Sequence, residues 1–367
     1  MSTPVSGSGR RRVSAGLPDF PWDLLEPSKR RAAAHPDGIV DLSIGTPVDP
    51  VPAVVRKALA EASDAPGYPL TAGTAELRQE ITAWTVRSCG AAPGFGVLPT
   101  IGSKELVAWL PTLLGVGAGD TVVIPEVCYP TYEVGVQLAG ARVLRADTPP
   151  AGERPALIWI NSPGNPHGRV ASEAELRAWI AYARATGAVL VSDECYLTLP
   201  WTATPVSVLS LCDGDFTGVL AVHSLSKRSN LAGYRAGFVA GDPELVGELL
   251  AVRKHAGMIM PAPVQAAMIA ALADESHVDE QRARYAARRE LLRGALLGAG
   301  FTIEHSEAGL YLWATRSEDC WTTVDALAEL GVLVAPGAIY GPGGAKHVRV
   351  ALTATDERVR TAVARLA

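Results

Sequence analysis

The stretch GVLAVHSLSKRSNLAGYRAGFVAG (218–241) joins two apolar runs, GVLAV (218–222) and AGFVAG (236–241), through a polar segment with a single lysine, Lys227. Apolar runs of this length, bounded by polar and glycine residues, predict buried β-strands. A lysine amine is a nucleophile only when it is deprotonated, so a site that lowers its pKa makes it chemically useful. A loop lysine near a helix start gives the same pattern, and the segment alone leaves both interpretations open.

Three further apolar runs end in chemically capable side chains. TVVIP (121–125) precedes EVCYPTY, ALIWI (156–160) precedes NSPGNPHG, and AVLV (188–191) precedes SDECY. The segment SEAELRAWIAYARATG (172–187) predicts a helix that Ser172 caps and Gly187 ends. Strands that alternate with helices indicate an α/β fold with a largely parallel sheet, whose ligands bind at the carboxyl ends of the strands. The residues expected at those ends are Tyr129, Asn161, Asn165, Asp193, Tyr196, Ser224 and Lys227.

The C-terminal part has a different pattern. We expect a buried helix that begins near Pro263, a long helix over about 275–299 whose arginines face solvent, and a helix near 321–330. Strand-like segments are FTIEHS (301–306), GLYLWA (309–314), VLVAP (332–336) and HVRVAL (347–352). We therefore expect a large domain over 42–255, a smaller α+β domain over 256–367, and an N-terminal segment, 1–41, that packs with the small domain.

Composition and charge restrict the partners. The chain has 367 residues and a formal net charge of −5, which gives no electrostatic reason to expect nucleic acid or a membrane as a partner. The five cysteines form no CxxC pair and the seven histidines show no metal-ligand spacing, so we expect a reduced, cytoplasmic protein without a metal. MSTPVSGSGRRR (1–12) lacks the apolar core of a signal peptide, and we expect its three arginines to lie in a disordered tail.

Four features complement the lysine. Asp193 follows a buried strand, where a carboxylate is costly unless it is paired. A cationic ring nitrogen would be a suitable partner, and a role as a turn or helix cap is the alternative. Arg235 suits bidentate binding of phosphate, and TIGSKELVAWL (100–110) predicts a helix whose first N–H groups can bind an anion. Tyr129 offers an aromatic ring for stacking. One ligand uses an amine, a carboxylate, a phosphate site and a ring together, and that ligand is pyridoxal 5′-phosphate.

At this point the sequence resembles a known family. NSPGNPHG (161–168), SDECY (192–196), HSLSKRSNLAGYRAG (223–237) and HVRVAL (347–352) resemble the fold-type-I, class I/II aminotransferases over nearly the whole chain. LPDFPWD (17–23), LSIGTPVDPVP (42–52), IPEVCYPTYEV (124–134) and HSEAGLYLWATR (305–316) resemble the actinobacterial N-succinyldiaminopimelate aminotransferases more closely. The resemblance implies a large domain with a mostly parallel mixed sheet between helices, a smaller α+β domain, and pyridoxal 5′-phosphate as cofactor.

The resemblance also implies roles for individual residues. Lys227 matches the lysine that binds the cofactor covalently, Asp193 the partner of the ring nitrogen, and Arg349 the ligand of the substrate α-carboxylate. Asn165 and Tyr196 match residues that hydrogen-bond the ring hydroxyl, and Tyr129 matches the aromatic residue that stacks on the ring. The matches to phosphate ligands are Ser224, Arg235 and the helix start Gly102, Ser103 and Lys104. Gly45 matches a glycine beside the substrate. Tyr68 matches a tyrosine that crosses a dimer interface to the neighbouring phosphate, which implies a homodimer.

One position departs from the family pattern, because the loop that often reads NPTG has His167 here, and we expect a local change in packing. The resemblance implies transfer of an amino group from N-succinyl-LL-2,6-diaminopimelate to 2-oxoglutarate in lysine biosynthesis. Candidates for its distal carboxylates are Lys104, Arg228, Arg253 and Lys254. The alternatives are another class I/II amino-acid aminotransferase (acetylated diaminopimelate or ornithine analogue, aromatic or aspartate donor) and a carbon–sulfur β-lyase. An effector-sensing domain of a transcription regulator is disfavoured, since the roughly forty residues before DLSIG are proline-rich and unlike a helix-turn-helix.

Overall fold

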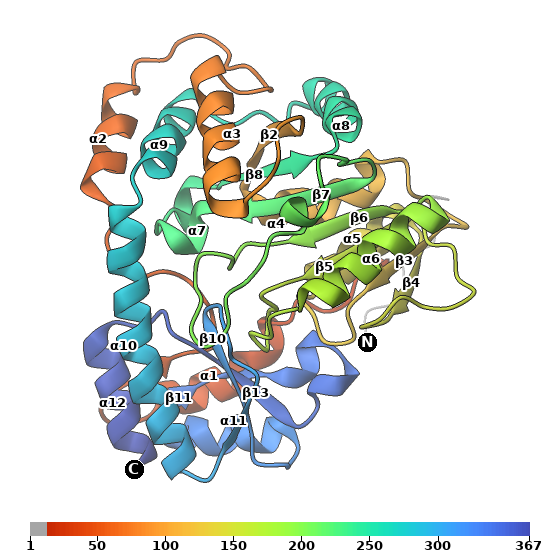
Figure 1. Cartoon of the computed structure of the whole chain (residues 1–367). Coiled ribbons are helices and arrows are strands. Elements are labelled where there is room, and N and C mark those ends of the chain that lie inside the picture. Colours follow the sequence, from red (N-terminus) through yellow and green to blue (C-terminus); the bar gives the residue numbers. More distant parts are fainter. Residues whose placement is uncertain (1–12) are drawn as a thin grey trace, which may run out of the picture.

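The computed structural model describes residues 13–367, so the Arg10–Arg12 tail lies outside the described residues. A seven-stranded sheet forms the centre, and all of its strands are parallel except β8, which runs antiparallel to both neighbours (Figure 1). In spatial order the strands are β2 (Gly96–Ile101), β8 (Ala236–Gly241), β7 (Val219–Ser224), β6 (Val189–Asp193), β5 (Leu157–Asn161), β3 (Thr121–Ile124) and β4 (Arg142–Arg145). The expected α/β class with a mostly parallel mixed sheet is confirmed.

Helices cover both faces of this sheet. Val219 and Ala221 of β7 pack in the core beside α6 (Glu173–Thr186), whereas Leu220 and Val222 pack in the core beside α4 (Gly102–Leu113), α5 (Thr131–Ala139) and α8 (Pro243–Ala256). Successive side chains of a strand point to opposite faces, so a strand buried on both faces is apolar at every position. This is why GVLAV is a continuous apolar run.

The helix boundaries follow local capping chemistry. Helix α6 begins after Ser172, which forms a capping box with Glu175, and it ends at Gly187 with φ +76°. Each of these interactions satisfies backbone groups that the helix leaves unpaired at its ends. The helix predicted from TIGSKELVAWL is α4, which begins at Gly102.

A second, four-stranded antiparallel sheet has the order β12 (Ala335–Pro336), β13 (His347–Ala351), β10 (Tyr311–Thr315) and β9 (Thr302–Glu304). Its helices are α10 (Ser276–Gly298), α11 (Cys320–Glu329) and α12 (Asp356–Leu366). The N-terminal helix α1 (Glu26–Ala33) lies beside α11, and β1 (Val40–Asp41) pairs in parallel with β11 (Val332–Leu333) (Figure 1). These contacts support the expectation that the N-terminal segment packs with the C-terminal part.

The remaining helices are α2 (Ala53–Glu61), α3 (Ala75–Cys89), α7 (Leu225–Arg228) and α9 (Ala262–Ala273), with short 3₁₀ turns at Val13–Gly16, Asp23–Leu25, Val208–Leu211, Ala232–Tyr234, Gly337–Tyr340 and Pro342–Gly344. Helix α9, expected near Pro263, packs on α2 and α3 around Met268 and Leu272. The division at residues 255/256 therefore stays a proposal, and the packing of α9 favours a boundary close to the start of α10.

The arginines of α10 correct one expectation. Arg284 and Arg293 are exposed, as expected, but Arg288 and Arg289 are buried. Arg288 binds both carboxylate oxygens of Asp49 at 2.6 and 2.7 Å, and its Nε donates to Asp356 at 2.7 Å. A buried arginine is tolerated when such a paired carboxylate balances its charge.

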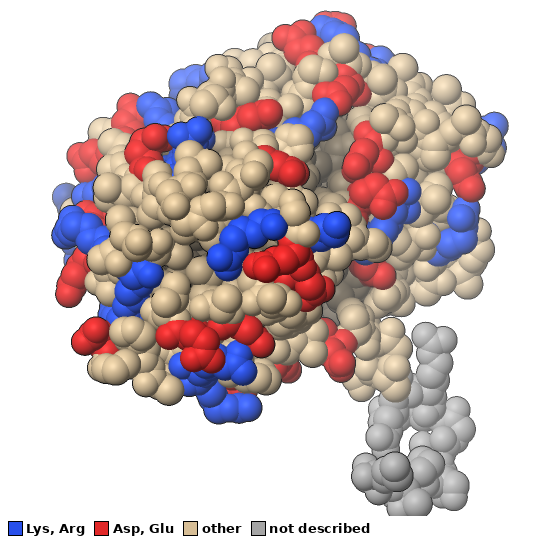
Figure 2. All heavy atoms as spheres, turned by 90° about the horizontal axis from the view of Figure 1, so that it is seen from below, with Lys and Arg blue, Asp and Glu red and all other residues tan. Residues whose placement is uncertain are grey.

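On the face seen from below, positive and negative side chains are interspersed (Figure 2). Among residues 13–367 no helix is both long and apolar enough to cross a membrane.

Candidate functional site

A cavity of about 840 Å³ lies at the carboxyl ends of β5, β6 and β7. This volume suits a small-molecule ligand together with a cofactor. Among the residues expected from sequence, the cavity is lined by Gly45, Ser103, Lys104, Tyr129, Asn161, Asn165, Asp193, Tyr196, Ser224, Lys227, Arg235 and Arg349. Residues separated by up to about three hundred positions in the chain are therefore brought to one place.

Asp193 is the last residue of β6 and is buried. The hydroxyl of Tyr132 donates a hydrogen bond to its Oδ2 at 2.7 Å, and the backbone N–H of Cys195 donates to its Oδ1 at 3.1 Å. Burial raises the pKa of Asp193, and these two donors oppose that shift because they stabilise the ionised form. The carboxylate points into the cavity, in a surrounding that favours a cationic partner.

Lys227 lies in the single turn α7 that follows β7, and Ser224 caps that turn by accepting a hydrogen bond from the N–H of Ser226. Its Nζ donates to the backbone carbonyl of Gly45. Burial lowers the pKa of Lys227, and the positive charges of Arg349 and Arg235 lower it further. A larger fraction of the amine is therefore available in its neutral, nucleophilic form than in an exposed lysine.

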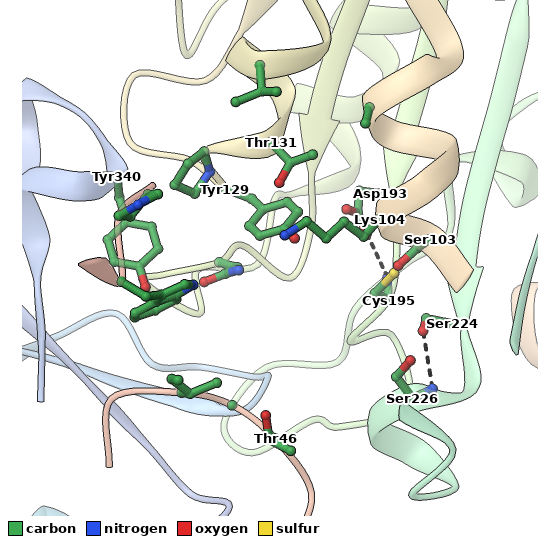
Figure 3. A pocket seen from close by; sticks show the side chains of 18 of the residues that line it. Thr46, Ser103, Lys104, Tyr129, Thr131, Asp193, Cys195, Ser224, Ser226 and Tyr340 are labelled. Atoms are coloured by element: carbon green, nitrogen blue, oxygen red, sulfur yellow. Dashed lines mark hydrogen bonds between the residues drawn. The ribbon is translucent and has the colours of Figure 1, made fainter. Parts of the chain in front are cut away.

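The start of α4 forms an anion site with Arg235. Gly102 has φ +70°, and a Cβ at this position would lie 2.4 Å from Nη2 of Arg235, so only glycine lets the guanidinium approach the helix start. Arg235 donates from Nη1 to the carbonyl of Ala232 at 2.7 Å. Ser103, Lys104, Ser224 and Ser226 lie on the same side of the cavity (Figure 3). Helix N–H groups, hydroxyls and a guanidinium are donors that suit a phosphate.

Arg349 of β13 also lines the cavity. It is buried, donates from Nη1 to Oδ1 of Asn165 at 2.9 Å and from Nη2 to the carbonyl of Ser43 at 2.7 Å. Its guanidinium packs against the rings of Tyr311 and Tyr340, with centroid distances of 3.9 and 4.9 Å. The remaining guanidinium edge faces a cavity in which a carboxylate is the natural partner.

Among the described residues six aromatic side chains line the cavity, and four of them are tyrosines: Tyr129, Tyr196, Tyr311 and Tyr340. Tyr129 lies between Tyr340 and Asp193 (Figure 3). The hydroxyls of Tyr196 and Tyr311 are 3.1 Å apart. Burial raises the pKa of Tyr311, but the nearby positive charges lower it below its usual value overall. The ring of Tyr129 and the paired hydroxyls give a planar ligand both a stacking surface and hydrogen-bonding partners.

Some expected residues lie elsewhere. Tyr68 is 99% exposed and does not line the cavity. Arg228 pairs with Glu275 at 2.9 Å and Arg253 binds Glu105 at 3.0 and 3.1 Å, so neither is available to a ligand in the cavity. Lys254 lies exposed on α8, outside the lining. Of the four suggested partners for distal carboxylates, only Lys104 faces the cavity, and the other three expectations were wrong.

His167 is half-buried and does not line the cavity. Its Nδ1 accepts a hydrogen bond from the N–H of Arg169 at 3.1 Å, and a Cβ on Gly164 would lie 2.1 Å from its ring. Burial and the neighbouring His305 lower the pKa of His167 to about 3, so the imidazole is neutral. The glycine makes room for the ring, which agrees with the expected local change in packing.

Tertiary structure also gathers Cys89, Glu194 and His223, three buried side chains whose ligand atoms lie within 4.8 Å of one another. Sequence spacing missed this group because its members are far apart in the chain. Burial raises the pKa of Glu194 to about 7, whereas burial and the charge of Arg228 lower the pKa of His223 to about 3. The arginine disfavours a further cation here, and the group is best described as a buried hydrogen-bonding cluster.

Sequence reasoning missed several lining residues and one supporting residue. The lining residues are Thr131, Cys195, Ser226, Tyr311 and Tyr340, and the supporting residue is Tyr132. No pattern in the sequence pointed to Tyr132, because its partner Asp193 lies 61 residues later in the chain, on β6.

The comparisons with known proteins agree with this geometry. Residues 37–366 match the family model described as aminotransferase class I and II. The chain is 63% identical over 372 residues to a probable aminotransferase of Mycobacterium tuberculosis, with 100% of this chain and 89% of the relative covered. It is 59% identical to the 4-dedimethylamino-4-oxo-anhydrotetracycline transaminase OxyQ of Streptomyces rimosus, with 95% of this chain and 99% of the relative covered.

Among solved structures, a probable N-succinyldiaminopimelate aminotransferase of Thermus thermophilus superposes with a TM-score of 0.85 at 31% identity, covering 95% of this chain and 99% of that one. The chain therefore belongs to the class I and II aminotransferases, the enzymes that use pyridoxal 5′-phosphate to transfer amino groups.

Proposed function

We propose that this aminotransferase transfers the amino group of N-succinyl-LL-2,6-diaminopimelate to 2-oxoglutarate, with Lys227, Asp193 and Arg349 as its central residues. The observation that carries the proposal is the joint placement of a half-buried amine, a buried carboxylate and a buried guanidinium around one cavity. Such a set matches a cofactor with an aldehyde and a basic ring nitrogen, and a substrate with an α-carboxylate.

The residues present fit pyridoxal 5′-phosphate. The start of α4 with Arg235 would hold its phosphate, Asp193 its ring nitrogen, and Tyr129 its ring face. Asn165 and Tyr196 would donate to the ring hydroxyl oxygen. When bound, the cofactor supplies an electron-withdrawing ring that stabilises negative charge at the substrate α-carbon.

The protein's own groups orient the substrate and move the proton. Arg349 binds the α-carboxylate, and Asn165 fixes the guanidinium by accepting a hydrogen bond from it at 2.9 Å. Lys227, whose pKa is lowered by burial, is the group that would take the proton from the substrate α-carbon and deliver it two atoms further along, to the former aldehyde carbon. Fixed positions for the carboxylate and the amine hold the reacting C–H bond toward the base.

Lys104 supports the choice of a donor with distal carboxylates. It lies at the start of α4, with its Nζ 5.6 Å from the ring centre of Phe20. Among the described residues that line the cavity, the other cations are Lys227, Arg235 and Arg349, each of which has a role above. Lys104 is thus the cation left for a carboxylate beyond the reacting centre, as the name of the Thermus thermophilus relative also suggests.

A second candidate is transamination of a polycyclic ketone of the kind named for the Streptomyces rimosus relative. The segment 17–22 lines the cavity mouth with Leu17, Phe20 and Trp22, and Ile44 is adjacent. An apolar, aromatic mouth of this kind favours a flat apolar substrate body. The two candidates therefore differ in whether Lys104 or the apolar mouth determines specificity.

A donor panel distinguishes them. Purified enzyme with cofactor and 2-oxoglutarate is given N-succinyl-LL-2,6-diaminopimelate, its acetylated analogue, ornithine, an aromatic amino acid or aspartate, and glutamate formation is followed. The succinylated donor should give the highest kcat/KM, and Lys104→Met should lower it about tenfold while leaving aspartate nearly unaffected. Glutamate-dependent amination of the anhydrotetracycline ketone without reaction of the succinylated donor would overturn the proposal. L-Cystathionine, with pyruvate as readout, tests the β-lyase alternative.

We also propose a homodimer in which Tyr68 reaches the neighbouring phosphate site. Its 99% exposure in a single chain supports this role. Mixing Lys227→Ala chains with Tyr68→Ala chains should restore activity above that of either variant alone, because one site of the hybrid dimer then has both residues. A monomer by sedimentation, or no gain on mixing, would contradict it.

A further inference from the structure

The Asp193 carboxylate in the cavity has a hydrogen-bond partner, Tyr132, that does not line the cavity. Tyr132 is fully buried, and its hydroxyl donates to Oδ2 of Asp193 at 2.7 Å. Tyr129, Pro130, Thr131 and Val134 of the same region line the cavity, whereas Tyr132 does not. It approaches Asp193 from inside the protein, so it acts on any ligand only through that carboxylate.

Packing fixes the position of this hydroxyl. The ring of Tyr132 stacks on Trp159 of β5, with centroids 4.9 Å apart and an interplanar angle of 22°. Tyr129 meets it edge-on at 5.8 Å and 88°. A ring held on two sides has one orientation, and its buried hydroxyl needs a partner, which is the carboxylate of Asp193.

The hydrogen bond affects which form of the carboxyl group is present. The titratable groups that face Asp193 are Tyr132 of α5, Tyr129 just before α5, and Glu194 and Cys195, which follow Asp193 in the chain. Burial favours the protonated acid, and a nearby Glu194 charge would favour it further. Donors favour the carboxylate. The thiol and the backbone N–H of Cys195 supply two, and Tyr132 supplies the third, from a hydroxyl that phenylalanine removes while keeping the ring.

We propose that Tyr132 is a positioning residue that keeps Asp193 ionised and aimed at the ring nitrogen of the cofactor. The inference rests on the assignment of Asp193 proposed above and is independent of the amino donor. A protonated Asp193 loses the negative charge that holds a proton on the ring nitrogen, and the ring then withdraws electrons less strongly. The hydrogen bond therefore supports catalysis from outside the cavity.

The test measures the ionisation of Asp193 directly. Full-length protein labelled with ¹³C at the aspartate carboxyl carbons is titrated by NMR, and Asp193→Asn identifies the Asp193 signal by its absence. Tyr132→Phe removes one oxygen and leaves the ring in place, so the midpoint should rise by about one pH unit, the effect of one hydrogen bond to a charged group. Tyr182→Phe, whose hydroxyl bonds only to backbone carbonyls near the surface, is the matched control and should leave the midpoint unchanged.

A second readout separates positioning from general packing. Tyr132→Phe should weaken binding of pyridoxal 5′-phosphate severalfold but leave binding of its 1-deaza analogue, which has no ring nitrogen, unchanged. Trp179→Phe truncates a buried ring in the core beside α6, apart from the cluster that holds Tyr132, so it should lower thermal stability without moving the Asp193 midpoint. If Tyr132→Phe does not fold, 3-fluorotyrosine at position 132 is a stronger donor and should lower the midpoint.

The outcomes distinguish the assignment of Asp193 to the ring nitrogen from the role of Tyr132. If Asp193→Asn binds the cofactor and its deaza analogue in the same ratio as the unaltered protein, the assignment of Asp193 itself fails. If Asp193→Asn changes that ratio but Tyr132→Phe changes neither the ratio nor the midpoint, the assignment stands and the role of Tyr132 is refuted.

Discussion

Replacing Gly102 with alanine tests the phosphate site most sharply. The new Cβ would lie 2.4 Å from Nη2 and 2.9 Å from Cζ of Arg235, so the guanidinium must move away from the start of α4. A charge-assisted hydrogen bond contributes about 1.5–3 kcal/mol, and each 1.4 kcal/mol changes a dissociation constant about tenfold. We expect the dissociation constant for pyridoxal 5′-phosphate to rise by about 10- to 100-fold.

Alanine at position 102 also strains the backbone, since φ there is +70°, and this effect needs a control. Gly115 has φ +74°, and a Cβ added there would meet no atom within 4 Å, so Gly115→Ala introduces the strain without the collision. Cofactor-free protein is titrated with pyridoxal 5′-phosphate by absorbance, and thermal unfolding of both variants is compared. Similar stabilities with cofactor affinities within about twofold of each other would refute the assignment of Arg235 to the phosphate.

Three other changes test separate parts of the molecule. Asp49→Asn removes the bidentate partner of buried Arg288, which keeps only Asp356, and should cost about 2 kcal/mol in urea unfolding at pH 7. Glu61→Gln in an exposed pair should cost nothing measurable. Burial raises the pKa of Asp49, but Arg288 lowers it below its usual value overall. The stability that the pair contributes is therefore present above about pH 4 and is lost as the pH falls through the folded-state pKa. A stability difference between the variant and the unaltered protein that persists undiminished at pH 2 would contradict the pairing. Arg349→Lys keeps the charge but loses the planar fork, and the KM for 2-oxoglutarate should rise about tenfold or more in steady-state assays, with an unchanged KM counting against its role. His167→Thr should change kcat less than about threefold, because the imidazole is neutral and lies outside the cavity lining; a larger loss would show that the ring does more than fill space.

The sheet was predictable because its strands are buried on both faces. TVVIP, ALIWI, AVLV and GVLAV all correspond to strands of the central sheet, and the residues that follow them meet at one edge. Lys227, Asp193 and Asn165 line the cavity for that reason. Because neighbouring parallel strands end at the same edge of the sheet, a residue that follows a predicted strand can be placed in the site from the sequence.

What escaped prediction depends on contacts between distant segments. The buried state of Arg288 is set by Asp49, more than two hundred residues earlier, and helical spacing alone predicts a solvated arginine. Tyr132 gains its role from Asp193 on another element, and Tyr311 from Arg349 on the neighbouring strand. Single-sequence patterns report which face a residue occupies, not which partner it meets there.

The identity of the amine that binds the cofactor is the claim on which the rest depends. Two lysines line the cavity, Lys104 and Lys227, and burial lowers the pKa of both. Borohydride reduces the bond between a lysine Nζ and the cofactor's aldehyde carbon to a stable secondary amine, which peptide mass spectrometry locates. We predict one modified peptide, containing Lys227, which is absent from Lys227→Ala; modification at Lys104 instead, or no adduct in protein loaded with pyridoxal 5′-phosphate, would contradict the assignment of Lys227.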